Sequence, residues 1–138
     1  MIVLDASVAV DMVRGTSDGM AYRELMLDGE KVVAPHLFVS EVANALLKYV
    51  RAGCFDAGTA AAMALEAYEI VDEFVPDENL MPEVLHEAAY NGHSSYDTFY
   101  LVLARRKKAT LFTRDKKLTA LCESCNIDCV HAVRLERV

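Results

Sequence analysis

The sequence predicts an α/β fold in which helices cover a mainly parallel β-sheet. Short apolar runs rich in β-branched residues alternate with longer stretches of helical period, which is the rhythm of consecutive β-α-β units. Hydrophobic residues make up 54% of the 138 residues, so the chain can bury a substantial core. Only three prolines and six glycines punctuate it, and no linker or repeat divides it. We therefore expect one domain over residues 1–138.

Five short segments are expected to form the strands of this sheet. Their apolar and β-branched content suits strands that are buried on both faces. They cover residues 2–5, 31–34, 73–75, 109–113 and 128–132.

The helices are expected between these strands, with one more after Asp115. Four segments have helical periodicity and cover residues 37–51, 57–71, about 82–92 and 95–107. Gly53 is placed to end the first of them. We expect the third to begin near Pro82, because proline suits a first helical turn, and to end near Gly92.

The charge balance and the apolar segments exclude two classes of protein. Fourteen basic against 21 acidic residues give a net charge of −7, which argues against coating nucleic acid by bulk positive charge. The apolar start ends at Asp5, too early for a signal peptide, and no segment reaches the roughly 18 apolar residues of a spanning helix. We expect a cytoplasmic protein with no membrane partner.

Two expected strands deliver an acidic residue to their carboxyl ends. Asp5 follows the first strand directly, and Asp115 follows the apolar run 110–113 one residue later. In open parallel sheets, ligand sites lie beyond the carboxyl ends of the strands. Both acids are therefore placed where a functional site is expected.

Two further acids, Glu41 and Asp97, lie in apolar stretches at the starts of expected helices and are expected to face inward. Each acid alone is explained as simply by helix capping or by the helix dipole. Four carboxylates around one strand edge would repel one another unless cations neutralise them. Oxygen-only ligand sets suit Mg²⁺ or Mn²⁺, so the four acids together predict a metal site.

At these residues the sequence resembles the PIN-domain nucleases, and within them the small VapC-type toxins of toxin-antitoxin pairs. The resemblance covers nearly the whole chain. It is carried by Leu4-Asp5-Ala6-Ser7, by Ala34-Pro35-His36-Leu37 leading to Glu41-Val42-Ala43-Asn44-Ala45-Leu46, by Tyr96-Asp97 and the helix through Leu103-Ala104, and by Leu111-Phe112-Thr113-Arg114-Asp115.

The resemblance implies a three-layer α/β/α sandwich and a Mg²⁺-dependent or Mn²⁺-dependent endoribonuclease. It implies that the acids are the metal ligands and catalytic residues, namely Asp5, Glu41, Asp97 and Asp115. It also implies that Ser7 and Thr113 support carboxylates or metal-bound water. Independently, phosphodiester cleavage needs an activated water and neutralised oxygens, and two metals roughly 3.5 to 4 Å apart can supply both.

Basic residues cluster around Asp115. Arg114, Lys116 and Lys117 lie beside a candidate ligand and are expected to contact RNA phosphates. The run 105–108 is explained equally well as a cationic helix end or as a second phosphate contact.

The remaining polar residues are expected to be structural. The four histidines, at positions 36, 86, 93 and 131, form no metal-binding or nucleophile pair, so we interpret them as packing or surface residues. Asp11 and Arg14 are expected to form a surface pair. Cys122, Cys125 and Cys129 form no second C-x-x-C pair and are interpreted as reduced thiols rather than a structural metal site.

The favoured function is that of a toxin restrained by a cognate antitoxin. The apolar residues between positions 38 and 100 exceed what one small core covers, which predicts a homodimer with a further groove for the partner. Three alternatives remain open: a PIN nuclease of RNA processing or decay without an antitoxin, a phosphotransfer enzyme with a strand-end Asp nucleophile, and a non-catalytic binding module. The second lacks the additional acid two residues after Asp5 that such enzymes use.

Overall fold

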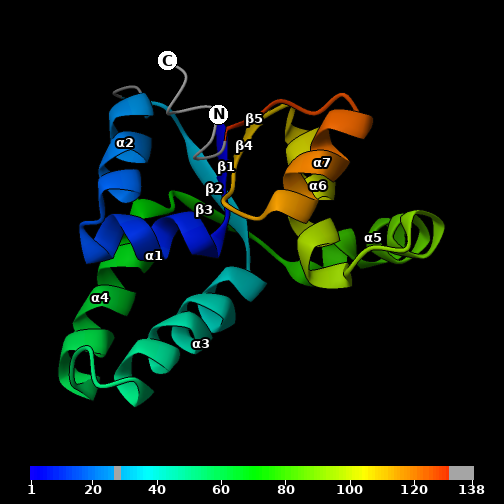
Figure 1. Ribbon diagram of the computed structural model, residues 1–138. Coiled ribbons are helices and arrows are strands. Elements are labelled where there is room, and N and C mark those ends of the chain that lie inside the picture. Colours follow the sequence, from blue (N-terminus) through cyan, green and yellow to red (C-terminus); the bar gives the residue numbers. More distant parts are fainter. Residues whose placement is uncertain (27–28, 131–138) are drawn as a thin grey trace.

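The computed structural model describes residues 1–26 and 29–130. Within them, five parallel strands form one sheet in the order β3-β2-β1-β4-β5 (Figure 1). They are β1 (Ile2–Leu4), β2 (Val32–Pro35), β3 (Glu73–Val75), β4 (Thr110–Phe112) and β5 (Cys129–Val130). The parallel sheet expected from the sequence is confirmed. Positions 131 and 132 of the last expected strand lie outside the described residues.

The helices of the described residues include two that the sequence pattern did not indicate, α1 and α2. The full set is α1 (Ala6–Arg14), α2 (Ser17–Leu25), α3 (Leu37–Arg51), α4 (Ala57–Ile70), α5 (Asp77–Asn91), α6 (Ser95–Lys107) and α7 (Lys116–Ser124). Gly15 ends α1 in the left-handed conformation, and the Thr16 side chain caps α2 by accepting a hydrogen bond from Gly19 N. None of the described helices is both long and apolar enough to cross a membrane.

Helix α5 begins at Asp77, so the expected start near Pro82 is wrong. Two acids, Asp77 and Glu78, occupy its first turn, where negative charge interacts favourably with the helix dipole. The Asp77 carboxylate also accepts a hydrogen bond from Leu37 N, which holds the start of α5 beside α3. These contacts outweigh the backbone hydrogen bond that Pro82 removes from the helix interior.

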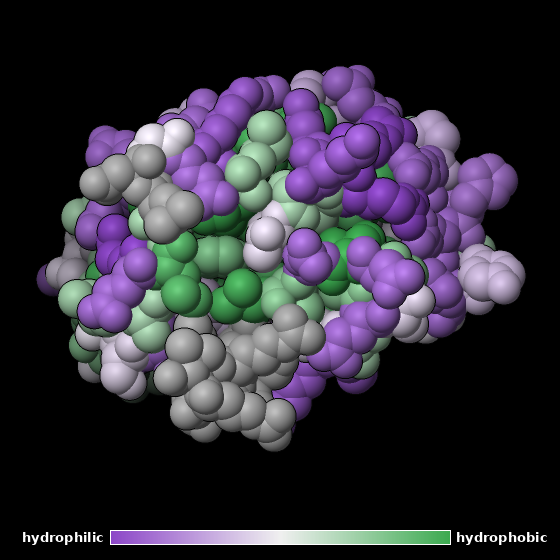
Figure 2. Space-filling view, turned by 90° about the horizontal axis from the view of Figure 1, so that it is seen from above, coloured by the Kyte–Doolittle hydropathy of each residue, from purple (hydrophilic) through white to green (hydrophobic). Residues whose placement is uncertain are grey.

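The sheet separates two helical layers, as expected for an α/β/α sandwich. Alternate strand residues enter opposite cores, as Leu4 and Val3 of β1 show. Helices α1–α4 pack on the face that includes Leu4, and α5–α7 pack on the face that includes Val3 (Figure 1). From the side where the chain begins, hydrophobic residues occupy the middle of the molecular surface and hydrophilic residues surround them (Figure 2).

Helices α1 and α2 approach each other closely at Gly19. A Cβ atom at this position would lie 2.2 Å from the backbone oxygen of Asp11. Only glycine lets the two backbones come this near. The contact fixes α2 against α1 on the side of the sheet that carries α3 and α4.

Candidate active site

Four acidic residues gather at the carboxyl edge of the sheet. Asp5 directly follows the central strand β1, and Asp115 follows the neighbouring strand β4. Glu41 lies in α3, which follows β2, and Asp97 lies in the first turn of α6. Electrostatic interactions link Asp5 to both Glu41 and Asp97, and Asp97 to Asp115. The four acids therefore share one region although 110 positions of sequence separate the first from the last.

The Asp5 carboxylate is buried and held by two hydroxyl groups. Ser7 Oγ donates to Asp5 Oδ2 over 3.0 Å, and Thr113 Oγ1 donates to the same oxygen over 2.6 Å. Burial raises the pKa of Asp5 to about 6, against the lowering effect of the two hydroxyls, and the charge of Asp97 adds to the rise. The site thus keeps a carboxylate where ionisation is costly.

Glu41 is half-buried and hydrogen-bonded to a tyrosine of the opposite helical layer. Tyr100 Oη donates to Glu41 Oε1 over 2.7 Å. Burial raises the pKa of Glu41 to about 7, and the charges of Asp5 and Asp97 add to the rise. Burial also raises the pKa of Tyr100 well above 10, so the phenol stays protonated and acts as the donor.

Asp97 and Asp115 line an open depression of about 440 Å³ together with His93, Lys116 and Lys117. His93 Nε2 lies 3.3 Å from Asp97 Oδ2 without the alignment of a hydrogen bond. Burial raises the pKa of Asp97, the charge of Asp115 raises it further, and His93 opposes the rise. Asp115 Oδ1 accepts a hydrogen bond from Leu118 N and so caps α7.

The donor chemistry of these four residues suits a hard divalent cation. The contacts described above fall on a single oxygen of each carboxylate: Oδ2 of Asp5, Oε1 of Glu41, Oδ2 of Asp97 and Oδ1 of Asp115. Oxygen-rich, negatively charged sets are what Mg²⁺ and Mn²⁺ prefer, and a cation would relieve the mutual repulsion. In residues 1–26 and 29–130, no three His, Cys, Asp or Glu side chains lie close enough together to hold a metal ion without moving.

The three basic residues beside Asp115 differ in their surroundings. The Arg114 guanidinium pairs with the carboxylate of Asp11 and lies 3.2 Å from Asp18 Oδ2. Lys116 and Lys117 are exposed and line the depression that contains Asp97 and Asp115. The two lysines are therefore better placed than Arg114 to meet a phosphate.

Asp11 is buried, so its expected place in a surface pair is wrong. Only 3% of the residue is exposed. Two arginines compensate its charge: Arg114 on Oδ2, and Arg14 at 3.7 Å from Oδ1. Because Arg114 lies between Thr113 and Asp115, its pairing with the buried Asp11 anchors the segment after β4 to α1.

The basic run at residues 105–108 is engaged within the protein. Arg105 hydrogen-bonds Glu83 and Glu87 of α5, and Arg106 hydrogen-bonds Glu83. Lys107 Nζ lies 3.9 Å from Glu73 Oε1. These contacts favour the structural explanation of the run, because they join α6 to α5 and β3.

The cysteines and histidines contribute little to the site, with one exception. Cys122 and Cys129 are buried in the core between the sheet and α7, and none of the four cysteines, all of them described, forms a disulfide. His93 is the exception, because it lines the acidic depression. His93 lies in the short connection before Ser94, the N-cap of α6, so helical spacing gave no signal for this contact. His131 lies outside the described residues.

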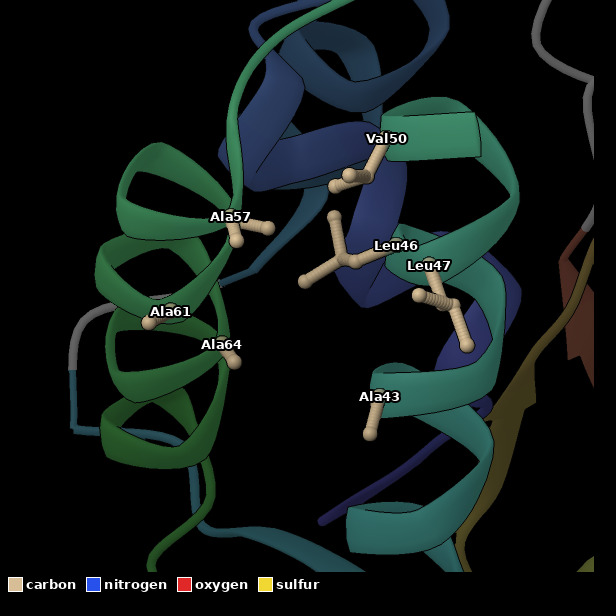
Figure 3. Close-up of a pocket in the computed structure, with 8 residues that line it drawn as sticks. Ala43, Leu46, Leu47, Val50, Ala57, Ala61 and Ala64 are labelled. Carbon is tan, nitrogen blue, oxygen red and sulfur yellow. The ribbon is translucent and has the colours of Figure 1, made fainter. Parts of the chain in front are cut away.

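A separate apolar groove runs between α3 and α4. Two adjoining cavities of about 260 and 380 Å³ share Ala43, Ala61 and Ala64. Leu46 and Leu47 of α3 face the small side chains of α4 across the first cavity (Figure 3). Alanines on both helices keep the groove open.

A family comparison decides what kind of protein carries this site. The PIN domain family matches residues 2–124. The chain belongs to the PIN domain family.

Solved structures share this PIN fold. PAE2754 from Pyrobaculum aerophilum has 25% sequence identity and a TM-score of 0.68, with 86% of this chain and 82% of that chain covered. FitAcB from Neisseria gonorrhoeae has 15% identity and a TM-score of 0.66, with 95% of this chain and 97% of that chain covered. VapC20 from Mycobacterium tuberculosis is described as a sarcin-ricin loop cleaving toxin. It has 17% identity and a TM-score of 0.59, with 88% of this chain and 95% of that chain covered. No curated relative matches the chain.

Proposed function

We propose that this PIN domain, acting as one unit over residues 1–138, is a Mg²⁺-dependent or Mn²⁺-dependent endoribonuclease and the toxin of a toxin-antitoxin pair. The observation that carries the proposal is the set of four carboxylates at one sheet edge, three of them hydrogen-bonded through one oxygen. Carboxylates that raise one another's pKa are costly to keep together unless the site binds cations. PIN family membership supports nuclease chemistry for such a site.

The four acids would hold the cation, and three of them are oriented by different parts of the chain. Ser7 and Thr113 orient Asp5, the start of α7 orients Asp115, and Tyr100 contacts Glu41. A bound divalent cation would supply the positive charge that activates a water and stabilises the phosphodiester oxygens. The protein supplies the fixed geometry, which lowers the reorganisation needed during the reaction.

Lys116 and Lys117 would position the RNA backbone. Both are exposed at the rim of the depression that contains two of the acids. Contacts to phosphates fix the register of a nucleic acid without reading its sequence. This local pair is compatible with the acidic net charge, because the attraction acts only at the site.

The groove between α3 and α4 would receive an apolar segment of the antitoxin. Leu65 and Tyr68 are 66% and 51% exposed along it, which is unfavourable for a protein without a partner. The structural likeness to FitAcB and to the toxin VapC20 supports a partner of this kind.

A second copy of the chain would bind elsewhere, at the exposed Met81 and Leu85 of α5. The complex would act in the cytoplasm.

Incubation of the purified protein with total RNA tests the nuclease function. Cleavage is expected with Mg²⁺ or Mn²⁺ and is expected to stop when a chelator is added. Mapping of the cut ends would show whether one site or many are cleaved. Asp97→Asn, purified in parallel, is the control for contaminating nucleases. Equal cleavage by both proteins, or cleavage that resists the chelator, would contradict the proposal.

A further inference from the structure

The Glu41 carboxylate has an unusual support. Its hydrogen bond comes from Tyr100, 59 positions away in sequence. Glu41 belongs to α3, in the helical layer on one face of the sheet, whereas Tyr100 belongs to α6 in the layer on the other face. The bond therefore joins the two layers beyond the end of the sheet.

Tyr100 is itself rigidly placed. Only 1% of the residue is exposed. Its side chain belongs to the core on the Val3 face of the sheet, which also contains Leu101 and Leu103 of the same helix. It also lies three positions after Asp97, on the same face of the helix. A single helical turn thus presents one acid and the phenol that holds another.

Glu41 needs such a support more than the three aspartates do. Its side chain has one more rotatable bond than an aspartate, and unlike Asp5 and Asp115 it does not occupy a helix N-cap. Donation to Oε1 occupies one oxygen of the carboxylate and restricts its rotation. Partners that hydrogen-bond a metal ligand orient it and tune its affinity for the ion.

We propose that Tyr100 is a positioning residue of the active site, which holds Glu41 in the orientation that binds the divalent cation. The inference rests on the proposed function, since it assigns Glu41 to a metal site. Tyr100 is assigned no part in the chemical step, because its side-chain hydrogen bond goes to a ligand of the proposed cation. Its contribution is therefore measured as cation affinity, in addition to turnover.

A double-mutant cycle on Mn²⁺ binding tests the inference. Titration calorimetry of the full chain would compare the unsubstituted protein, Tyr100→Phe, Glu41→Gln and the double variant. We expect Tyr100→Phe to weaken Mn²⁺ binding about tenfold. In the Glu41→Gln background the same change should have little effect, because the phenol no longer has a charged ligand to orient. Equal effects in both backgrounds would overturn the inference and indicate general packing damage.

Tyr49→Phe is the matched control. The Tyr49 hydroxyl accepts a hydrogen bond from Arg14 over 2.8 Å, so this variant also loses a phenol contact, but one that involves none of the four acids. Its Mn²⁺ affinity should stay unchanged. If the unsubstituted chain binds no Mn²⁺, the proposed metal site and this inference both fall. If it binds Mn²⁺ and Tyr100→Phe binds equally well, only the inference falls.

A measurement without a destabilising substitution covers the case in which Tyr100→Phe does not fold. The chain is labelled with 3-fluorotyrosine, and the ¹⁹F resonance that Glu41→Gln shifts is assigned to Tyr100. Addition of Mg²⁺ should shift the same resonance. The cation withdraws electron density from the carboxylate, which changes the strength of the hydrogen bond that the phenol donates to it. A resonance that responds to Glu41→Gln but not to Mg²⁺ would overturn the inference.

Discussion

Thr113 Oγ1 donates a 2.6 Å hydrogen bond to Asp5 Oδ2 and so joins residues 108 positions apart. The same hydroxyl oxygen accepts a hydrogen bond from Asp115 N over 3.0 Å. One side chain therefore sets the spacing between the acid that follows β1 and the acid that follows β4. The following predictions start from this arrangement.

Asp5→Asn and Asp97→Asn should each reduce RNA cleavage by about 100-fold or more, because each removes a charged cation ligand. Asp5→Asn should also stabilise the metal-free protein at pH 7.5 by about 1 to 3 kcal/mol, since the buried charge disappears while the amide oxygen can still accept both hydroxyl bonds. Gel assays and urea unfolding would measure the two effects. Asp56→Asn, which alters an exposed helix cap, should leave cleavage intact.

The stability of the metal-free protein should fall as the pH rises from about 4 to about 7. A carboxyl group whose pKa is higher in the folded state binds more protons when folded, so unfolding becomes easier as the pH rises through that interval. The interval is 3.8 to about 6 for Asp5 and 4.5 to about 7 for Glu41. The effect is read as the difference between the unsubstituted chain and Asp5→Asn/Glu41→Gln at each pH. A constant difference would contradict it, and saturating Mg²⁺ at pH 7.5 should restore stability.

Lys116→Ala/Lys117→Ala should weaken binding of a short single-stranded RNA and lower the slope of log K against log salt by about 1.4, for two lost phosphate contacts. Ca²⁺ would occupy the site during the titrations to limit cleavage. Arg114→Ala should instead lower stability and keep the slope, because its guanidinium pairs with Asp11 and Asp18. Lys48→Ala, on the exposed side of α3, serves as the control. A slope lowered by Arg114→Ala would assign that residue a phosphate contact as well.

Light scattering at micromolar concentration should find a dimer. The exposed Met81 and Leu85 lie four positions apart on α5 and form one apolar strip, at 49% and 59% exposure. Met81→Glu/Leu85→Glu should therefore give a monomer, whereas Leu65→Glu, in the groove of α4, should remain dimeric. The opposite pattern would place the dimer contact in the groove, and a monomeric parent protein would refute the dimer.

Gly19→Ala should destabilise the protein by about 1 to 3 kcal/mol, because the added methyl group would lie 2.2 Å from the Asp11 carbonyl oxygen. Gly58→Ala provides the opposite case. Its nearest neighbour, Asp56 Oδ1, would be 3.5 Å from the new Cβ, so the change should leave stability unchanged or raise it by up to about 1 kcal/mol. Urea unfolding of both variants would measure the difference. Equal stabilities would show that α2 can move away from α1.

Much of the fold could be predicted because its signals are local. The limits of α3 and α6 follow from periodicity and agree with the sequence prediction at both ends. Helices α1 and α2 could not be recognised in this way. Helix α1 has only nine residues and even Asp11 on its polar face is buried, whereas α2 buries only Gly19 and Tyr22. Packing of α2 on α1 stabilises this pair, and that contact is tertiary.

The acids of the site could be proposed from their places at strand and helix ends, but their supports could not. From the sequence, Tyr100 is expected only to pack in the core. Its hydrogen bond to Glu41 depends on how the two helical layers meet. From the sequence, Asp11 is expected to be a surface charge, because no residue near it in sequence indicates that Arg114 will form an ion pair with it. Both roles arise from long-range contacts, which residue spacing does not encode.

The central position of β1 has a consequence for the order of events during synthesis. Its two neighbours are β2 and β4, so β1 lacks one partner until residues 110–112 have been made. The roughly 110 residues from Asp5 to Asp115 take about 6 to 22 s at 5–20 residues per second. A nascent chain in that interval carries the first acids without the last, and Thr113 has not yet reached Asp5. The nuclease proposed here would therefore lack a complete site until the segment that carries Thr113 and Asp115 has been translated.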